Sequence, residues 1–426
     1  MYNFDGPVKK NIILVPQEFD VIANEYSGDL YGYIRKDTGV YVILGWDGNI
    51  PDCALQIERI GRVNANPDDL DAWEAAEEDF RRSGRHYHTD WTHWVHGVKI
   101  ADGVEYRGMD NRGKITLKKE VYSVTQDVFS RNSGLLETDD MKEKTALIVG
   151  CGSVGSTLAL QLARSGVGRF VLVDTDTIEI HNICRHQCNL TDVGRYKTDA
   201  LRDRIIAINP FAVVTRFNKI IQNVTDEELN CVLDNQSIIV GCGDNRLSDA
   251  FACELAYARD IPFVSIGFWT RASVCEIVVC IPQRGDTCYR CAMEDRIEGE
   301  VETRNRNRFY IGEDDKAKAA FEPGIAVDIE FGTSIGSKIV LDALNLKNPR
   351  YISKVLHTLT QYTLICNTNN PEISGSGALG FSAPLQVVRV KNMPHKKDTC
   401  SFCSKSERIE SFNPQAQVIH VLPNEL

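Results

Sequence analysis

Residues 150–187 read GCGSVGSTLALQLARSGVGRFVLVDTDTIEIHNICRHQ, and this stretch decides the fold class. Gly150, Gly152 and Gly155 follow the apolar run ALIV and open a helix-like segment. A glycine turn between a strand and a helix lets backbone N–H groups approach a phosphate at the helix N-terminus. Asp174 ends the next apolar strand, where a carboxylate can accept hydrogen bonds from a ribose. The pattern predicts a nucleotide-binding loop, and by itself it fits NAD or FAD as well as ATP.

Strand-like and helix-like segments continue to alternate after this loop. The helical pattern YKTDALRDRIIAIN is followed by three apolar runs of strand length: VVTRF, SIIVGCG and PFVSIGF. Such alternation predicts a largely parallel sheet with helices on both faces. The expected fold class is therefore α/β, with a doubly wound, mostly parallel, Rossmann-like sheet over residues 121–426. Residues 1–120, with the strand-like runs NIILVP and GVYVILGW and a helix-like run at 68–84, predict a separate α+β domain.

Composition limits the classes of protein to which the chain can belong. With 426 residues we expect two domains or three, and a quarter of charged residues is ordinary for a globular protein. The net charge of -11 argues against a nucleic-acid partner, because binding phosphates requires a surplus of basic residues. No apolar run is long enough to span a bilayer and the N-terminus has no apolar signal core, so we expect a cytoplasmic protein without a membrane partner.

Charged and polar residues follow several of the expected strands. Arg185 and Lys197 lie after the second strand of the unit, and Asp244 and Asn245 follow SIIVGCG. In a doubly wound sheet the loops at the carboxyl ends of the strands converge on one crevice. Two cations and a carboxylate in that crevice suit a triphosphate with Mg²⁺, whereas a nicotinamide cofactor brings only a pyrophosphate. The sequence thus favours ATP with Mg²⁺ over a dinucleotide.

From about Val128 to Cys403 the chain resembles the ThiF/MoeB/HesA adenylation family, which includes the ubiquitin-activating enzymes. The resemblance is carried by these motifs: GCGSVGS, LVDTDTIEIHNICRHQ, GRYKTDALRDRIIAINP, VGCGDNR and EFGTSIGSKIVLDAL, together with two Cys-x-x-Cys pairs. It implies an enzyme that joins AMP from ATP to the C-terminal carboxylate of a small protein or peptide and releases pyrophosphate. An NAD-dependent oxidoreductase and an inactive adenylation fold used for binding stay open as alternatives.

The resemblance also assigns roles to individual residues. It implies that Asp174 holds the ribose, that Asn182, Arg185 and Lys197 contact the phosphates, and that Asp244 binds Mg²⁺. The segment VFSRN, just before the glycine loop, suggests that Arg131 reaches into the site of a partner subunit in a homodimer. The expected catalytic residues are Arg131, Arg185, Lys197 and Asp244. The expected nucleotide-binding residues are Gly150, Gly152, Ser153, Gly155, Asp174, Asp176, Asn182, Arg185, Gln187, Lys197, Asp244 and Asn245.

Four of the fourteen cysteines form two pairs with two-residue spacing. Cys288 and Cys291 make the first pair, and Cys400 and Cys403 the second. This spacing lets two thiolates bind one metal ion, and four sulfurs suit tetrahedral zinc with no open coordination position. We expect a structural zinc site that fastens the C-terminal segment to the domain. Redox chemistry is the alternative, although redox motifs rarely occur as two pairs on distant segments.

Ubiquitin-activating enzymes also use a cysteine that takes the activated carbonyl as a thioester. The simpler members of the resembled family carry it in the crossover loop, here residues 292–322 and the segment up to the helix GTSIGSKIVLDAL. No cysteine occurs between Cys291 and Cys366. Cys366, at the end of an apolar run, and Cys184 and Cys188, on either side of Arg185, are the other candidates, and for each we favour burial or packing.

The N-terminal domain contains the histidine-rich run RHYHTDWTHWVHG. His86 and His88 have the spacing of two metal ligands on one face of a strand, with Asp90, His93 and His96 nearby. The order of elements loosely resembles an inactive JAMM metalloprotease domain. The more economical role is recognition of a protein substrate or a conjugating enzyme.

Two functions therefore follow for the whole chain. The first is activation of a ubiquitin-like protein, with a conjugating enzyme and a second copy of the chain as the expected partners. The second is adenylation of a peptide or a sulfur carrier, of the microcin or molybdopterin type, without a thioester.

Overall fold

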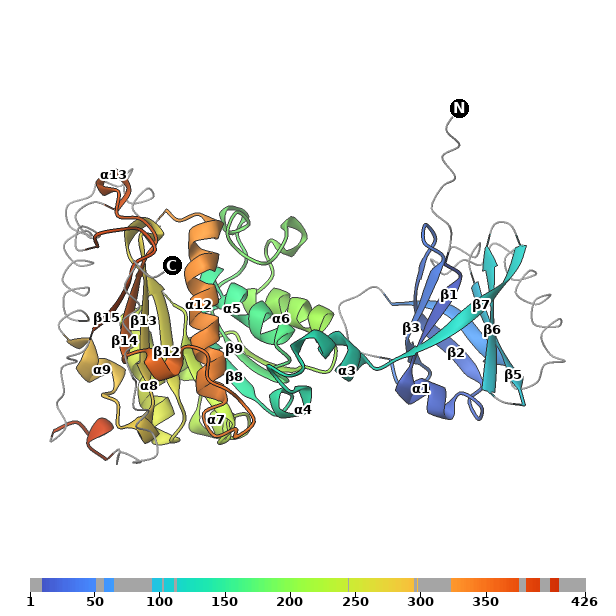
Figure 1. Ribbon diagram of the computed structural model, residues 1–426, viewed down its shortest axis with the longest axis horizontal. Helices are drawn as coiled ribbons and strands as arrows, with labels where there is room; N and C mark the ends of the chain where they lie inside the picture. Colours follow the sequence, from blue (N-terminus) through green and yellow to red (C-terminus); the bar gives the residue numbers. More distant parts are fainter. Residues whose placement is uncertain are drawn as a thin grey trace, which may run out of the picture. The chain divides into compact units, whose positions relative to one another are not determined.

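The computed structural model describes residues 10–50, 57–64, 94–101, 103–110, 113–243, 245–294, 297, 323–374, 381–390 and 399–405. The chain divides into two compact units, Met1–Arg131 and Asn132–Leu426 (Figure 1). No helix in the described ranges combines the length and apolarity that crossing a membrane requires.

The N-terminal unit contains a closed β-barrel. Its described strands are β1 (Ile12–Pro16), β2 (Gly28–Arg35), β3 (Val40–Trp46), β4 (Glu58–Asn64), β5 (Trp94–Ile100), β6 (Gly103–Asp110) and β7 (Gly113–Tyr122), and the short helix α1 (Gln17–Ile22) follows β1. The strand order is β1-β3-β2-β4-β5-β6-β7, and β1 closes the barrel by pairing in parallel with both β3 and β7. Alternate residues such as Ile13, Val15, Leu30 and Tyr106 fill a separate hydrophobic core.

Both strands expected near the N-terminus are present as β1 and β3. The helix expected at 68–84 lies outside the described residues, as do His86, His88, Asp90 and His93. His96 is described, and its side chain is buried in β5.

The C-terminal unit is built on an eight-stranded sheet with the order β10-β9-β8-β11-β12-β13-β14-β15. The first five strands in this order are parallel and the rest antiparallel. Their bounds are β8 (Thr145–Val149), β9 (Arg169–Val173), β10 (Val213–Phe217), β11 (Ser237–Gly241), β12 (Phe263–Phe268), β13 (Val274–Cys280), β14 (Tyr362–Cys366) and β15 (Val387–Val390). This confirms the expected doubly wound α/β fold.

Helices cover both faces of this sheet. Helices α5 (Ser153–Arg164), α6 (Lys197–Ile208) and α12 (Ala326–Leu344) pack on one face, and α8 (Arg246–Ala258) packs on the other. The shorter helices are α3 (Val124–Val128), α4 (Thr138–Met141), α7 (Asp226–Asn230), α9 (Tyr289–Ala292) and α13 (Pro371–Ser374).

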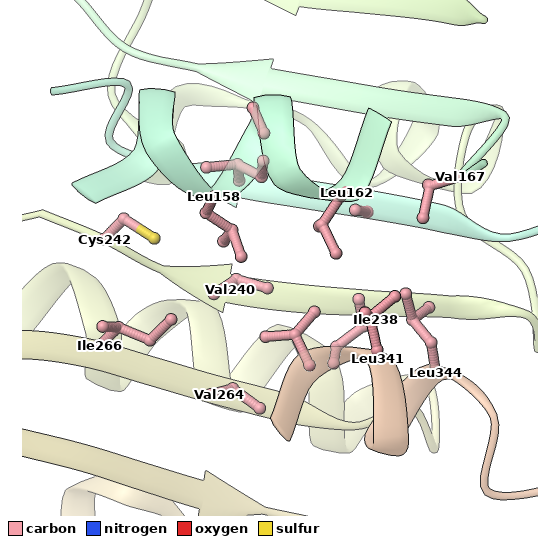
Figure 2. Packing of buried hydrophobic residues seen from close by; sticks show 14 of the residues in the cluster. Leu158, Leu162, Val167, Ile238, Val240, Cys242, Val264, Ile266, Leu341 and Leu344 are labelled. Carbon is pink, nitrogen blue, oxygen red and sulfur yellow. The ribbon is translucent and has the colours of Figure 1, made fainter. Parts of the chain in front are cut away.

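Side chains of the central strands alternate between these two layers. In β11, Ile238 and Val240 point toward α5 and α12, where they meet Leu158, Leu162 and Leu341 (Figure 2). The intervening Ile239 joins the opposite core with α8. All five residues of β8 and of β11 are buried, as expected for central strands covered on both sides.

The chain reverses its direction of winding between β8 and β11. From β8 it proceeds to β9 and β10 on one side, and from β11 to β12 on the other. Such a switch point leaves a crevice at the carboxyl ends of the two strands, which is where ligands bind in open α/β sheets.

Candidate active site

A cavity of about 810 Å³ lies at this crevice. Its wall includes residues that directly follow β8, β9 and β11, together with the end of β12. The volume falls within the range of about 300–1,000 Å³ that is usual for small-molecule sites. The position of the cavity agrees with the crevice predicted from the sequence.

The glycines of the first loop allow very close backbone approach. Gly150 has a φ of +91°, and a Cβ there would lie 2.9 Å from the backbone nitrogen of Gly243. A Cβ on Gly155 would lie 1.9 Å from the Gly150 carbonyl oxygen, so α5 could not pack against the loop with a larger residue. Gly152, the N-cap of α5, has open space on its Cβ side. The loop therefore leaves room beside a helix N-terminus for an anion.

Asp174, directly after β9, forms hydrogen bonds that hold the glycine loop at the end of the neighbouring strand β8. Its Oδ2 accepts a hydrogen bond from the Cys151 N–H at 2.7 Å, and its Oδ1 accepts one from the Asp176 N–H at 2.8 Å. The carboxylate also lines the cavity. Asp174 thus has a structural role in the loop that the sequence did not indicate.

Lys197 brings a positive charge to the cavity from the first residue of α6. Its Nζ lies 2.7 Å from Asp176 Oδ2, and only 12% of its side chain is exposed. Burial opposes the charged form, but the carboxylates of Asp174 and Asp176 outweigh it and raise the pKa of Lys197. The hydrogen bond from Lys197 lowers the pKa of Asp176. Both groups are therefore ionised at neutral pH.

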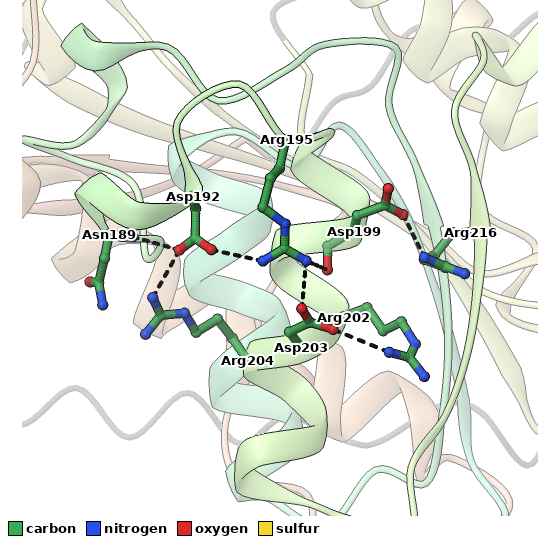
Figure 3. A network of polar contacts seen from close by, with 8 residues as sticks. All are labelled: Asn189, Asp192, Arg195, Asp199, Arg202, Asp203, Arg204 and Arg216. Atoms are coloured by element: carbon green, nitrogen blue, oxygen red, sulfur yellow. Dashed lines mark hydrogen bonds and ion pairs between the residues drawn. The ribbon is translucent and has the colours of Figure 1, made fainter. Parts of the chain in front are cut away.

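A network of ion pairs fastens the loop before Lys197 to α6 (Figure 3). The buried Asp192 accepts hydrogen bonds from the Asn189 N–H at 2.9 Å, from Arg195 at 2.9 Å and from Arg204 at 2.8 Å. Arg195 also pairs with Asp203 on α6. Asp192 pairs with two arginines, and Arg195 pairs with two aspartates. The network therefore restrains the loop more than isolated surface pairs would.

Most of the nucleotide-binding residues expected from the sequence meet at the cavity. The members of that set that line it are Gly150, Gly152, Ser153, Asp174, Asp176, Asn182, Arg185, Lys197 and Asn245. Gly155 lies behind the loop as described above. Gln187 does not line the cavity, and its Nε2 instead donates to Thr157 Oγ1 at 3.2 Å and to Glu330 Oε1 at 2.7 Å.

Of the other two expected catalytic residues, Asp244 lies outside the described residues. Arg131 is exposed in a short 3-10 helix (Ser130–Asn132) and is not part of the cavity wall. The next residue, Asn132, donates from Nδ2 to the Arg164 carbonyl oxygen at 2.9 Å and so ties this segment to the end of α5.

The cavity also contains a polar group that the sequence analysis missed. Arg246, the first residue of α8, pairs with Glu276 on β13 at 2.6 Å. Glu276 Oε2 accepts hydrogen bonds from Trp269 Nε1 at 3.1 Å and from the Tyr362 hydroxyl at 2.7 Å. Burial opposes ionisation of Glu276, but the charge of Arg246 and these hydrogen bonds lower its pKa.

Asp249, one turn further along α8, is also buried at the cavity wall and accepts a hydrogen bond from Ser265 Oγ at 2.6 Å. A Cβ at Gly241 would lie 2.2 Å from its Oδ1, so the glycine at the end of β11 makes room for this carboxylate. The motif GDNR, directly after a predicted strand, includes Arg246 and so indicated its position. Its partner Glu276 lies thirty residues away in an apolar strand.

The two Cys-x-x-Cys pairs come together in space. The sulfur atoms of Cys288, Cys291, Cys400 and Cys403 all lie within 4.8 Å of one another. The Cys288 and Cys400 sulfurs are 3.6 Å apart, and those of Cys291 and Cys403 are 4.0 Å apart. Tetrahedral ligation at a metal–sulfur distance of ~2.3 Å would separate the sulfurs by about 3.8 Å, so the cluster fits one metal ion.

The cysteines considered for a thioester differ in exposure. Cys366 is buried in β14, and burial raises the pKa of its thiol. Cys188 is also buried, and burial raises the pKa of its thiol to about 12. Cys184 is exposed beside the cavity residue Arg185, and its Sγ lies 3.4 Å from the His181 carbonyl oxygen.

The fold and the cavity define the chain as an α/β protein with a polar cavity at the switch point of its sheet. The ThiF family model matches residues 126–346, just over half of the chain. The chain therefore belongs to the ThiF family.

Parts of the chain are similar to proteins of known name. The chain is 29% identical over 174 residues to the molybdopterin-synthase adenylyltransferase of Escherichia coli, which is 41% of this chain and 68% of that protein. It is 34% identical over 142 residues to a tRNA threonylcarbamoyladenosine dehydratase of Bacillus subtilis, covering 32% of this chain and 55% of that one. A crystal structure of E. coli MccB with ATP aligns with a TM-score of 0.46 at 19% identity, over 66% of this chain and 75% of that chain. The chain is an enzyme of the adenylyltransferase class.

Proposed function

We propose that the protein adenylates the C-terminal carboxylate of a ubiquitin-like protein, using ATP and Mg²⁺. The observation that carries the proposal is the convergence of the glycine loop, Asp174, Arg185 and Lys197 on one cavity at the switch point. In the reaction a carboxylate oxygen bonds to the α-phosphorus, the bond from that phosphorus to the bridging oxygen breaks, and pyrophosphate leaves. A carboxylate is already ionised at neutral pH, so no general base is needed.

The residues of the cavity supply fixed positive charge for this step. The N-terminus of α5 and the cations Arg185 and Lys197 can stabilise the negative charge that develops on the phosphate oxygens. Mg²⁺ would neutralise charge on the leaving pyrophosphate, and Asp244 is the residue expected from the sequence to hold it. Arg131 would add a further cation from the second subunit of a homodimer.

We further propose that the substrate's tail enters beside β12, along the wall formed by Gly267, Trp269 and Glu276. Gly267 lines the cavity, and its Cβ side is open for 4 Å. Its register partner on β13 is Glu276, so both face the same side of the sheet. Open space beside a glycine near the end of a strand can accommodate an extended chain with small terminal residues.

A valine at Gly267 should therefore block the tail and spare the nucleotide. Valine suits a strand, and a Cβ at this position has no neighbour within 4 Å. For Gly267→Val we expect ATP–pyrophosphate exchange with the protein substrate to fall about 100-fold or more, with an unchanged dissociation constant for an ATP analogue. Thr215→Val, in the edge strand β10, is the matched control and should exchange like the wild type.

The test of the function itself is ATP–pyrophosphate exchange with candidate proteins that end in a free glycine. Exchange that depends on such a protein supports the proposal, and exchange only with short peptides supports the peptide or sulfur-carrier alternative. Binding of a nicotinamide cofactor with no affinity for ATP would refute both.

A thioester step requires an exposed thiol near the cavity. Among the described cysteines, Cys184 combines exposure with a position next to a cavity residue. An adduct between this chain and the substrate that thiols cleave, and that Cys184→Ser abolishes, would establish the step and favour transfer to a conjugating enzyme. An adenylate without such an adduct would favour the peptide or sulfur-carrier type of chemistry.

We propose zinc as the metal of the four-cysteine cluster. Four thiolates at these distances leave no open position, so the ion would be structural. Stoichiometric zinc in the purified protein is the expected result of metal analysis.

A further inference from the structure

The imidazole of His186 links the segment after β9, to which it belongs, to the glycine loop after β8. His186 is 7% exposed and lies next to Arg185 in the segment after β9. Its Nε2 is 2.7 Å from the carbonyl oxygen of Cys151, the middle residue of the glycine loop. Its Nδ1 accepts a hydrogen bond from the Cys188 N–H at 3.1 Å.

These two partners determine the tautomer of the ring. A backbone N–H can only donate, so Nδ1 must carry a lone pair, and the proton must be on Nε2. Nε2–H therefore donates to the Cys151 carbonyl. Burial lowers the pKa of His186, which keeps the ring neutral and in this donating form at physiological pH. The charged groups around the ring are Lys197, Asp174 and Asp192.

Cys151 is consequently held on both sides by side chains. Its N–H donates to Asp174 Oδ2 at 2.7 Å, and its C=O accepts from His186 Nε2 at the same distance. The peptide bond is planar, so fixing the Cys151 carbonyl also fixes the direction of the Gly152 N–H. Gly152 caps α5 and lines the cavity. Fixed donors of this kind bind phosphate without first having to reorganise.

We propose that His186 is a positioning residue that orients the glycine loop for the phosphates of ATP. The inference rests on the proposed function, because it requires ATP to bind in this cavity. His186 lines the cavity, but both of its ring nitrogens are engaged by backbone groups. Its effect is transmitted through the Cys151 peptide.

Two substitutions separate the two hydrogen bonds of the ring. In His186→Gln, the side-chain amide can extend as far as Nε2 and donate to the Cys151 carbonyl. In His186→Asn, the shorter amide can replace Nδ1 as an acceptor for the Cys188 N–H but cannot reach Cys151. If the bond to Cys151 orients the loop, glutamine should preserve nucleotide binding and asparagine should not.

The experiment is calorimetric binding of α,β-methylene ATP with Mg²⁺ to the full-length chain, which needs no protein substrate. We expect the dissociation constant to rise about tenfold in His186→Asn and to stay within threefold of the wild type in His186→Gln. The matched control is Asn209→Ala. Asn209 is 4% exposed and donates to the Val167 carbonyl oxygen at 3.1 Å, away from the cavity. This variant should lose thermal stability but bind the analogue normally.

The outcomes separate failure of this inference from failure of the function. A wild type that does not bind the analogue refutes the proposed function. A wild type that binds it, together with a folded His186→Asn variant of equal affinity, refutes the positioning role. If His186→Asn does not fold, the glutamine variant still decides, because weak binding by a folded His186→Gln would show that the donor to Cys151 is not what matters.

Discussion

Lys197 is held in place by Asp176 through both its backbone and its side chain. Its backbone N–H donates to the Asp176 carbonyl oxygen at 2.9 Å, and its ammonium pairs with the Asp176 carboxylate. The side chain therefore has little freedom before a substrate arrives. Preorganised charge of this kind is among the largest contributions to enzyme catalysis.

Replacing Lys197 by alanine should lower the rate of exchange about 10²–10³-fold, because a cation that meets developing charge is removed. Asp176 is largely exposed, so the loss of its partner should leave the fold intact. Steady-state ATP–pyrophosphate exchange measures the rate, and circular dichroism checks the fold. The control is Lys142→Ala, which removes an exposed pair with Asp139 and should exchange normally. A Lys197→Ala variant with the wild-type rate would exclude Lys197 from the reaction.

At the scale of elements, α12 carries a buried carboxylate that organises the segment after it. Asp342 accepts hydrogen bonds from the Tyr351 hydroxyl at 2.6 Å, from Ser353 Oγ at 2.9 Å, and from the N–H groups of Val355 at 2.7 Å and Leu356 at 2.8 Å. Burial opposes ionisation, but these donors outweigh it and lower the pKa of Asp342. The helix that packs against α5 is thus joined to the turn that leads into β14.

Asp342→Asn should destabilise the protein by about 2–4 kcal/mol at pH 7, since an amide cannot accept all of these hydrogen bonds. The native-state pKa of Asp342 is lowered, so its ionisation contributes stability above the unfolded pKa of about 3.9. That contribution is lost as the pH falls through the native pKa. The difference in unfolding free energy between wild type and variant should therefore shrink in acid. Urea denaturation at pH 7 and at pH 3 measures it, and a difference independent of pH would contradict this role.

The sequence predicted those parts of the fold and site that depend on local patterns. The alternation from β8 to β12 was predicted correctly, because apolar runs and glycine turns specify it within a few residues. The pairing of Arg246 with Glu276 was missed because the two residues lie thirty positions apart, on α8 and on β13, and no local pattern links them. His186 was overlooked since its role depends on the Cys151 carbonyl, which leaves no mark in the sequence.

For the whole molecule, the four-cysteine cluster links two segments that are far apart in the sequence. It joins α9 to a segment 112 residues further along the chain. A metal ion held by all four sulfurs restricts the unfolded chain as a cross-link does, and metal binding adds to the free energy of folding.

Cys400→Ser should release the metal and lower the stability by about 2–5 kcal/mol, the range expected for losing a long-range cross-link. The cysteines do not line the nucleotide cavity, so binding of the ATP analogue should persist in the folded variant. Metal analysis and thermal unfolding, each with and without a chelator, measure the effect. A wild-type protein without stoichiometric metal, or with a melting temperature that a chelator leaves unchanged, would contradict the assignment.

In the N-terminal unit, the single short strand β1 closes the barrel by pairing with strands that lie far apart in the sequence. β1 pairs along one side with β3 and along the other with β7. If Ile12–Pro16 were displaced, both of those neighbours would acquire unpaired backbone groups at once, next to the apolar barrel interior. Exposed backbone groups of this kind can pair with strands of another molecule. Proteolysis or mutation near β1 would therefore promote aggregation through the N-terminal barrels, while the C-terminal unit stays folded.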